Sequence, residues 1–207
     1  DWGEPNKLRY AVRTAGALGY VALVGLDRVT ATGFGRAGAN GDAYLSPRRG
    51  KRQALALFDF LQDLTQADGA MQGPTLLAQR LRSYAASAVQ PGPLVLLSDL
   101  LDEGWADGLR ALASRGFEVS VLHVLAPDEV DPGLGGDLKL LDVETGAEVE
   151  ITADYDLLQR YRDGLAAWRE ELRRFCGARG MHYVPIETTV PFEELMFALL
   201  RQRGVLK

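Results

Sequence analysis

The run Pro93-Leu94-Val95-Leu96-Leu97-Ser98 constrains the fold most, because its residues are apolar without interruption and then give way to the polar pair Ser98 and Asp99. A strand with one wet face alternates polar and apolar residues, whereas a continuous apolar run predicts a strand buried on both faces. Phe117 to Leu125 is a second run of this kind and is expected to be a central strand. Two such strands indicate a parallel sheet covered by helices on both sides.

Helical periodicity surrounds these strands. Apolar residues three and four positions apart predict a first helix from about Pro5 to Gly25 and a long amphipathic helix from Tyr155 to Cys176. Further helices are expected over 55–64, 77–84, 105–116 and after 191, and further strands over 27–34, 43–45 and 181–186. This order predicts a doubly wound three-layer α/β sandwich with a mostly parallel sheet, formed by a single domain over residues 1–207.

A short strand at 43–45 and a small inserted hairpin complete the expected elements. Pro47 is expected to end the strand at 43–45, since proline donates no ladder hydrogen bond. A small inserted hairpin is predicted at about 137–152, with a turn at Thr145-Gly146. Its apolar face would hold Leu141, Val143, Val149 and Ile151, and its acidic face Asp142, Glu144, Glu148 and Glu150. Facing carboxylates repel one another, so the acidic face should be solvated, where it could also meet a basic partner.

The charge of the chain argues against two classes of partner. The formal net charge is -5 and the sequence pI is about 5.1, so the overall balance gives no basic footprint for nucleic acid or for an anionic membrane. The cluster Arg48, Arg49, Lys51 and Arg52 is most simply a solvated turn before a helix, with phosphate binding as the alternative. No apolar segment has bilayer length and no signal peptide is visible, so a cytoplasmic protein is expected.

Nucleophilic chemistry has few candidates in this sequence. Cys176 is the single cysteine, which excludes an intramolecular disulfide and a Cys-x-x-Cys metal knuckle. It lies in a helical segment and is expected to be a partly buried thiol. His123 falls within the second apolar strand, where a hydrogen-bonded core histidine is a simpler interpretation than a ligand.

The end of the first apolar strand is the best candidate site. Ligands of open α/β sheets bind beyond the carboxyl ends of strands, which is where Ser98 and Asp99 should project. A hydroxyl and a carboxylate there, with the hydroxyl of Thr75 from a neighbouring loop, suit a small hard cation. The alternative is that Thr75 and the Ser98-Asp99 pair only cap helices.

Seven segments of the chain carry a resemblance to a known family. They are Lys7-Leu8-Arg9-Tyr10-Ala11, Asp27-Arg28-Val29, Ser46-Pro47-Arg48-Arg49-Gly50, Gly73-Pro74-Thr75, Leu96-Leu97-Ser98-Asp99-Leu100-Leu101-Asp102, Gly116-Phe117-Glu118-Val119 and Leu141-Asp142-Val143-Glu144-Thr145-Gly146. In this order the chain resembles a von Willebrand factor A-like domain. More narrowly, it resembles the bacterial family called domain of unknown function fifty-eight, which is often encoded beside MoxR-type AAA+ ATPases.

This resemblance implies a metal-ion-dependent adhesion site. Thr75 and Asp99 match two of its three parts and would bind Mg²⁺ or a similar divalent cation, with Ser98 and Asp102 in possible supporting positions. The third part, an Asp-x-Ser-x-Ser loop after the first strand, is not found in these residues. The resemblance also implies a central strand between the strand at 27–34 and the strand at 93–98, which this sequence does not supply. An upstream segment or another chain is expected to fill that place.

The function expected from these features is a non-enzymatic protein-interaction module. It would recognise an acidic partner residue through the bound cation, and the resemblance points to an AAA+ ATPase as partner. One alternative is a metal-independent scaffold that uses the acidic hairpin or the helix at 155–176. A less favoured alternative is a metal-dependent phosphoester hydrolase using Asp99, Asp102 and Glu103, because two-metal chemistry needs clustered carboxylates.

Overall fold

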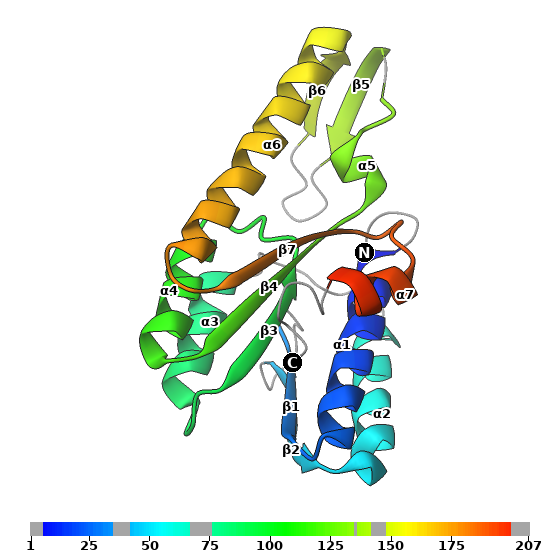
Figure 1. Cartoon of the computed structure of the whole chain (residues 1–207). Helices are drawn as coiled ribbons and strands as arrows, with labels where there is room; N and C mark the ends of the chain where they lie inside the picture. Colours follow the sequence, from blue (N-terminus) through cyan, green and yellow to red (C-terminus); the bar gives the residue numbers. More distant parts are fainter. Residues whose placement is uncertain (1–5, 35–41, 67–75, 135, 142–147, 200–207) are drawn as a thin grey trace.

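A three-stranded parallel sheet forms the centre of the protein, in the order β3 (Pro93–Ser98), β4 (Glu118–Leu125), β7 (His182–Glu187). The computed structural model describes residues 6–34, 42–66, 76–134, 136–141 and 148–199 (Figure 1). β4 is paired on both sides, and seven of its eight residues are buried. The prediction of a central, doubly covered strand over 117–125 is therefore confirmed.

The other elements follow the predicted order closely. They are α1 (Lys7–Val24), β1 (Arg28–Gly33), β2 (Ala43–Arg49), the 3-10 turn η1 (Lys51–Gln53), α2 (Ala54–Gln66), α3 (Leu77–Ser87), α4 (Trp105–Arg115), α5 (Pro127–Val130), β5 (Gly136–Leu141), β6 (Glu148–Ala153), α6 (Tyr155–Gly177), α7 (Phe192–Glu194) and the π-helical turn η2 (Leu195–Leu199). Among the helices that the structure describes, none joins the length and the apolar character that a bilayer crossing needs.

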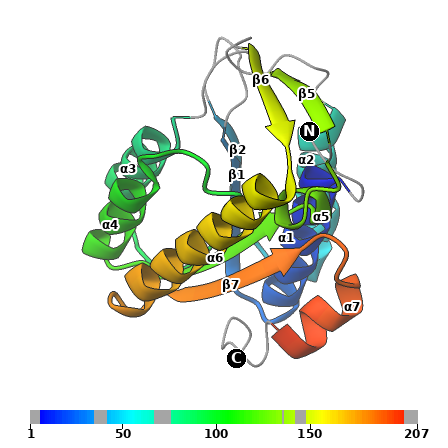
Figure 2. The ribbon, with the colours of Figure 1, turned by 90° about the horizontal axis from the view of Figure 1, so that it is seen from above.

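Helices cover the parallel sheet on both faces. Helices α3, α4 and α6 pack on one face, where Leu109, Leu112 and Leu172 are completely buried. Helix α1 and the turn η2 pack on the other face against Leu122 and Ile186 (Figures 1 and 2). The fold is thus mixed α/β, with helices on both faces of the parallel sheet. The expectation that the run 93–98 is buried on both faces is wrong: only Leu96 of β3 is buried and Val95 is 36% exposed, because β3 pairs only with β4 among the described strands.

The antiparallel hairpin β1–β2 is a separate two-stranded sheet that packs with α1 and α2 around Leu23 and Leu57. Within the described residues β1 pairs only with β2, and β3 pairs only with β4. No described strand lies between β1 and β3. The central strand expected at that place stays a prediction.

Strand β2 corrects the expectation that Pro47 ends it. The strand continues to Arg49, and the register of the hairpin shifts between Val29 and Ala31. Ser46 and Pro47 of β2 stand opposite the single residue Thr30, which is the two-against-one count of a β-bulge. A proline is tolerated in a bulge because no ladder hydrogen bond from its nitrogen is needed there.

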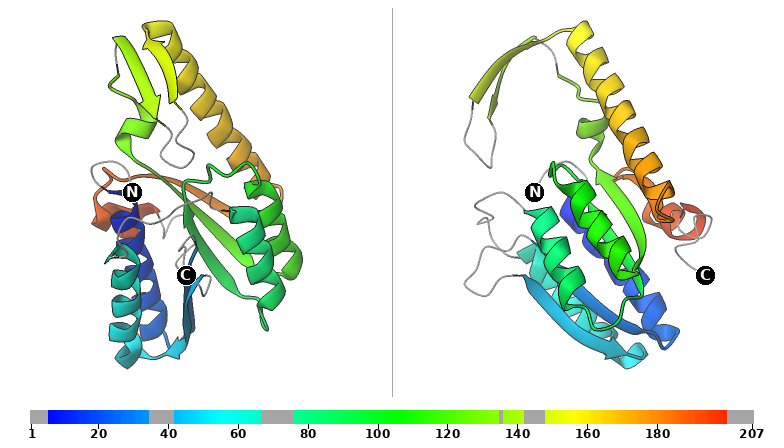
Figure 3. Two further views of the ribbon diagram at one scale, coloured as in Figure 1. Left: turned by 180° about the vertical axis from the view of Figure 1, so that it is seen from behind. Right: turned by 90° about the vertical axis from the view of Figure 1, so that its left-hand side faces the viewer.

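The hairpin β5–β6 is present where the sequence predicted it, and it projects from the end of the molecule at which α6 begins (Figure 3). Its register corrects the predicted faces, since position 141 is paired with position 148 and so belongs to the face of Glu148. Lys139 shares this face and bonds Glu148, with Nζ 2.6 Å from Oε2. The face is therefore of mixed charge. Asp142, Val143, Glu144 and the Thr145-Gly146 turn lie outside the described residues.

The close contact between α3 and α4 yields a stability prediction. A Cβ added at Gly108 of α4 would lie 2.8 Å from Leu81 Cδ1 and 3.2 Å from the Cα of Ala78. Gly108→Ala should therefore lower the free energy of unfolding by about 1–3 kcal/mol, since α3 must move away. Gly164→Ala on α6 is the matched control, because nothing lies within 4 Å of that position. It should stabilise the helix by about 0.5–1 kcal/mol. Urea unfolding of both variants measures this difference, and equal stabilities would contradict it.

Candidate functional site

The carboxyl ends of β3 and β4 bring together the residues that the sequence singled out and several that it did not. At this edge Lys7, the first residue of α1, bridges two carboxylates: its Nζ lies 2.9 Å from Oδ2 of Asp99 and 2.6 Å from Oε1 of Glu129. The other oxygen of Glu129 accepts a hydrogen bond from the backbone nitrogen of Ala126 at 2.7 Å. One ammonium group therefore joins α1, the end of β3 and α5.

The charge state of Lys7 follows from its surroundings. Burial alone would lower the pKa of its ammonium group, but the hydrogen bond to Glu129 and the charge of Asp99 outweigh burial and raise the pKa above its ordinary value. The side chain is 17% exposed, so the bridge is largely shielded from water. Lys7 thus stays protonated at neutral pH and neutralises part of the charge of Asp99.

His123 of β4 is completely buried and uses both ring nitrogens. Its Nε2 lies 3.0 Å from the carbonyl oxygen of Asp99, which only accepts, so Nε2 is the donor. Nδ1 lies 2.7 Å from the hydroxyl of Tyr183 and accepts from it in the neutral ring. Burial, followed by the charge of Arg169, lowers the pKa of His123 to about 4. The prediction of a hydrogen-bonded core histidine is confirmed.

The loop after β3 is fixed by its own polar side chains. Ser98 Oγ accepts a hydrogen bond from the backbone nitrogen of Leu100 at 3.0 Å. Asp102 accepts from the nitrogen of Gly104 at 2.6 Å and from the nitrogen of Leu77 at 2.9 Å, so it caps the start of α3 from a distant part of the chain. Ser98 therefore bonds within the loop and not to a helix end, and the residue that caps a helix here is Asp102, which the capping alternative did not name.

Between those polar contacts the backbone adopts an unusual conformation. Leu100 has φ +56°, in the left-handed region that leucine rarely occupies. Its own side chain is almost fully buried, but the reversal of the chain leaves the next residue, Leu101, 64% exposed. Residues with such a strained backbone conformation cluster at functional sites.

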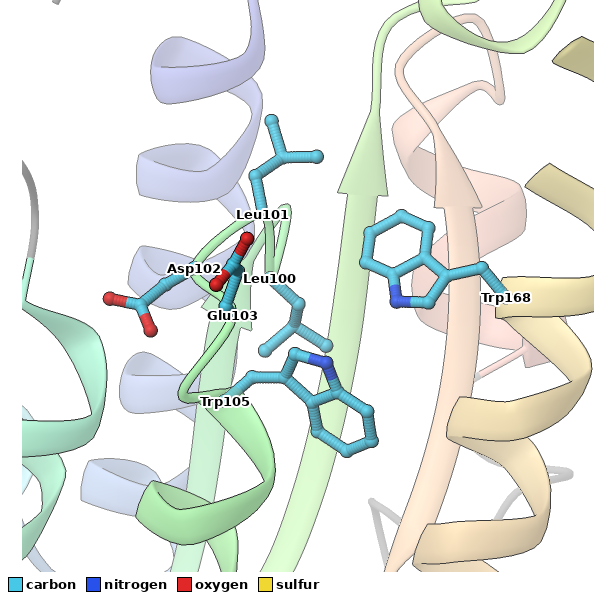
Figure 4. Close-up of a pocket in the computed structure, with 6 residues that line it drawn as sticks. All are labelled: Leu100, Leu101, Asp102, Glu103, Trp105 and Trp168. Atoms are coloured by element: carbon cyan, nitrogen blue, oxygen red, sulfur yellow. The ribbon is translucent and has the colours of Figure 1, made fainter. Parts of the chain in front are cut away.

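A pocket of about 250 Å³ lies beside Leu101. We name it the strand-end pocket, and its lining residues are Leu100, Leu101, Asp102, Glu103, Trp105 and Trp168. Figure 4 shows that Trp168 reaches it from α6 and that the indole nitrogens of the two tryptophans face the space between the rings. Neither indole has a hydrogen-bond partner among the described residues. The ring of Trp168 is held edge-to-face against His123, with centroids 4.9 Å apart.

The predicted cation site stays a prediction, since Thr75 lies outside the described residues. Asp99, Ser98 and Asp102 lie together in the loop after β3, but Lys7 occupies one oxygen of Asp99, and two backbone nitrogens occupy Asp102. Within the described ranges no group of three or more His, Cys, Asp or Glu side chains is placed to hold a metal ion.

The predicted partner surface on the hairpin is also described in part. Glu148 is bonded to Lys139, and position 150 is the register partner of position 139. Asp142 and Glu144 lie outside the described residues. Cys176, the other candidate for chemistry, is completely buried, and burial raises the pKa of its thiol to about 11, which keeps it a neutral thiol at pH 7.

The sequence reasoning missed Lys7 and Trp168 as members of this site. One signal for Lys7 was available: a cation in the first turn of a helix is disfavoured by the helix dipole. A lysine directly after the capping residue Asn6 therefore suggests a carboxylate nearby. No comparable signal marks Trp168. It lies three and four residues from other apolar residues of the same helix, and a tryptophan with that spacing is expected to be a core residue.

Removing the bridging cation should destabilise the protein. Lys7→Met leaves Asp99 and Glu129 as partly buried carboxylates without their counterion, so unfolding at pH 7 should require about 1–2 kcal/mol less than in the unchanged protein. Lys139→Met breaks the exposed pair with Glu148 and should cost less than about 0.5 kcal/mol. Denaturant unfolding of the two variants checks this. Equal losses would mean that the Lys7 bridge contributes no more than a surface ion pair.

The neutral state of His123 predicts a pH dependence. The unfolded histidine binds a proton with a pKa near 6.5, and the folded one only at about 4, so protons favour the unfolded state between these values. The free energy of unfolding should fall by up to about 3 kcal/mol from pH 6.5 to pH 4 through this group. In His123→Gln that part of the fall should disappear. His182→Gln, at an exposed position of β7, should keep it, and a His123→Gln profile parallel to the unchanged protein would contradict the assignment.

Relatives of this chain occur in mycobacteria. An uncharacterized protein of Mycobacterium avium is 32% identical over 162 residues, which cover 77% of this chain and 94% of that protein. Uncharacterized proteins of Mycobacterium bovis and Mycobacterium tuberculosis are 27% identical over 206 residues, which cover 97% of this chain. The chain spans 62% of the length of these two relatives.

A solved structure shares the fold. It is a crystal structure described as an aerotolerance-related membrane protein from Bacteroides fragilis with multiple mutations to serines, and it matches with a TM-score of 0.54 at 16% identity. The match covers 98% of this chain and 90% of that one. The family described as "protein of unknown function DUF58" matches residues 3–171. With this match over most of its length, and with the relative from Mycobacterium avium, the chain belongs to that family.

Proposed function

We propose that this protein is a protein-interaction module that holds a segment of a partner protein in the strand-end pocket. The observation that carries the proposal is the exposed Leu101, which is set beside Trp105 and Trp168 by the left-handed conformation of Leu100. Holding leucine in that conformation costs about 1–2 kcal/mol. Burial of the Leu100 side chain and the hydrogen bond from its nitrogen to Ser98 offset this cost.

The contacts at the site favour binding over catalysis. His123, the one described histidine near the pocket, is neutral, buried and hydrogen-bonded through both nitrogens, so a proton shuttle through it would have to break a core contact. The thiol of Cys176 is protonated and buried. The apolar side chains of Leu100 and Leu101 and the indole N–H groups of the two tryptophans, by contrast, suit a peptide segment. Such a segment would supply an apolar side chain and backbone carbonyl groups.

The proposed mode of binding is independent of metal. A divalent cation at Asp99 would stand beside the ammonium group of Lys7, which lies 2.9 Å from the same carboxylate and would repel it. The cation predicted at Thr75 and Asp99 remains the competing proposal, since it depends on Thr75. The two proposals differ in one measurable property, which is sensitivity to chelation.

The partner that we propose comes from the resemblance to von Willebrand factor A-like domains encoded beside ATPase genes. It is a MoxR-type AAA+ ATPase of the same organism. The three-layer fold with a parallel sheet is compatible with a von Willebrand factor A-like domain, and the pocket lies at the carboxyl ends of its strands, where such folds bind ligands.

The test is binding of the purified ATPase, measured by biolayer interferometry with Mg²⁺ and with EDTA. Affinity should be unchanged by EDTA and should fall about tenfold or more in Leu101→Lys, because a central apolar contact is lost. Val89→Lys is the matched control, since Val89 is 90% exposed and lies outside the pocket. Both positions are exposed, so thermal unfolding should be nearly unchanged in both variants.

Other outcomes select the alternatives. Binding that is lost with EDTA and in Asp99→Ala would replace the proposal with metal-bridged recognition. Binding that survives Leu101→Lys and is lost in Glu148→Lys would assign the contact to the hairpin β5–β6. Turnover of a phosphoester that is lost in Asp99→Ala would make the protein a hydrolase.

A further inference from the structure

The end of the molecule opposite the strand-end pocket carries a second unusual surface. It is formed where α1 ends and β1 begins, and where β2 ends and α2 begins, and these two connections lie side by side (Figures 1 and 3). Their proximity is fixed by a hydrogen bond of 2.7 Å from Nε of Arg49 to the carbonyl oxygen of Leu26. We name the residues 24–28 and 49–55 the basic tip.

Apolar side chains are exposed at the basic tip. Leu55 is 72% exposed, Leu26 59% and Val24 50%, although each belongs to a residue type that is usually inside. Tyr20 and Val21, one turn earlier on α1, continue the same exposed apolar strip. A continuous apolar surface of this kind indicates a contact with another molecule or with a membrane.

The charge at the basic tip is opposite to that of the whole chain. Four cations lie within it, Arg28, Arg49, Lys51 and Arg52, against the single acid Asp27, whereas the chain carries a net charge of -5. All four are exposed, and none forms an ion pair with a described residue. The sequence balance argued against an anionic membrane, but the fold gathers these cations around the exposed leucines. A molecule that approaches the basic tip therefore meets a positively charged surface, although the chain as a whole is acidic.

Backbone strain supports the same surface. Leu26 has φ +65°, in the left-handed region where glycine or asparagine would be at ease. Unlike Leu100, it gains no burial from this conformation, because its side chain is exposed. The left-handed backbone of Leu26 closes the carboxyl end of α1, where its nitrogen donates to the carbonyl of Leu23 at 3.2 Å and the nitrogen of Asp27 donates to the carbonyl of Ala22 at 2.9 Å. This conformation leaves the apolar side chain of Leu26 directed to water.

We infer that the basic tip is a docking surface for an anionic membrane. Apolar side chains at an extremity enter the boundary of the acyl chains, and Lys and Arg around them contact the anionic headgroups. This combination favours lipid over a folded protein, since the exposed leucine and valine are surrounded by cations without paired acids. The inference is independent of the strand-end pocket and of its partner.

The experiment is flotation of the whole chain with vesicles at about 0.15 M salt. Vesicles of phosphatidylcholine with about 30% phosphatidylglycerol should bind the protein, and vesicles of phosphatidylcholine alone should bind about tenfold less or weaker still. The double variant Lys51→Glu and Arg52→Glu should lose the difference between the two vesicles. Arg9→Glu with Arg82→Glu changes the net charge equally at exposed positions away from the tip, and it should keep that difference.

A second variant separates insertion from charge. Leu26→Asn suits the left-handed backbone, so the variant should fold at least as stably as the unchanged protein while binding anionic vesicles several-fold less. Val89→Asn is its control and should bind normally. The inference is overturned if anionic vesicles fail to float the protein, if both charge variants lose binding equally, or if Leu26→Asn binds like the unchanged chain. A tip that serves a protein partner would give the first of these results.

Discussion

The ammonium group of Lys7 is the contact on which the candidate site depends. It joins the first turn of α1 to the end of β3 through Asp99 and to α5 through Glu129. His123 holds the same loop from the other side, because its Nε2 donates to the backbone oxygen of Asp99. With both the side chain and the backbone of Asp99 fixed, the chain that follows has little freedom. The next residue, Leu100, adopts the left-handed backbone conformation and lines the strand-end pocket together with Leu101.

This arrangement explains why carboxylates that resemble a metal site are used here for internal contacts. A carboxylate at the carboxyl end of a parallel strand needs a counterion or hydrogen-bond donors when it is partly buried. Asp99 obtains an ammonium group, and Asp102 obtains two backbone N–H groups. Within the described chain one oxygen of Asp99 and both oxygens of Asp102 are thus engaged in internal contacts, next to the exposed side chain of Leu101.

The sequence predicted those parts of the fold that depend on local pattern. The apolar runs at 93–98 and 117–125 predicted two parallel strands, and the helical spacing predicted α1, α4 and α6 to within a few residues. The predicted burial on both faces is confirmed for β4 but is wrong for β3, of which only Leu96 is buried in the described chain. It failed at Pro47 because a bulge depends on the partner strand, and at the faces of β5–β6 because register is fixed by pairing between strands. The site was predicted in part for the same reason. Ser98 and Asp99 follow a recognisable strand, whereas Lys7 and Trp168 reach the site from helices distant in sequence.

Helix α1 gives the molecule a fixed internal distance. Its 18 residues span about 27 Å at the rise of an α-helix, with Lys7 at one end and Val24 at the other. It packs against the parallel sheet through Tyr10 and Leu18, and its last turn packs with α2 and β2 through Leu23. The strand-end pocket and the basic tip therefore lie near opposite ends of this helix. Two molecules that bound at these two places would be separated by about the length of α1, so each could be held without touching the other.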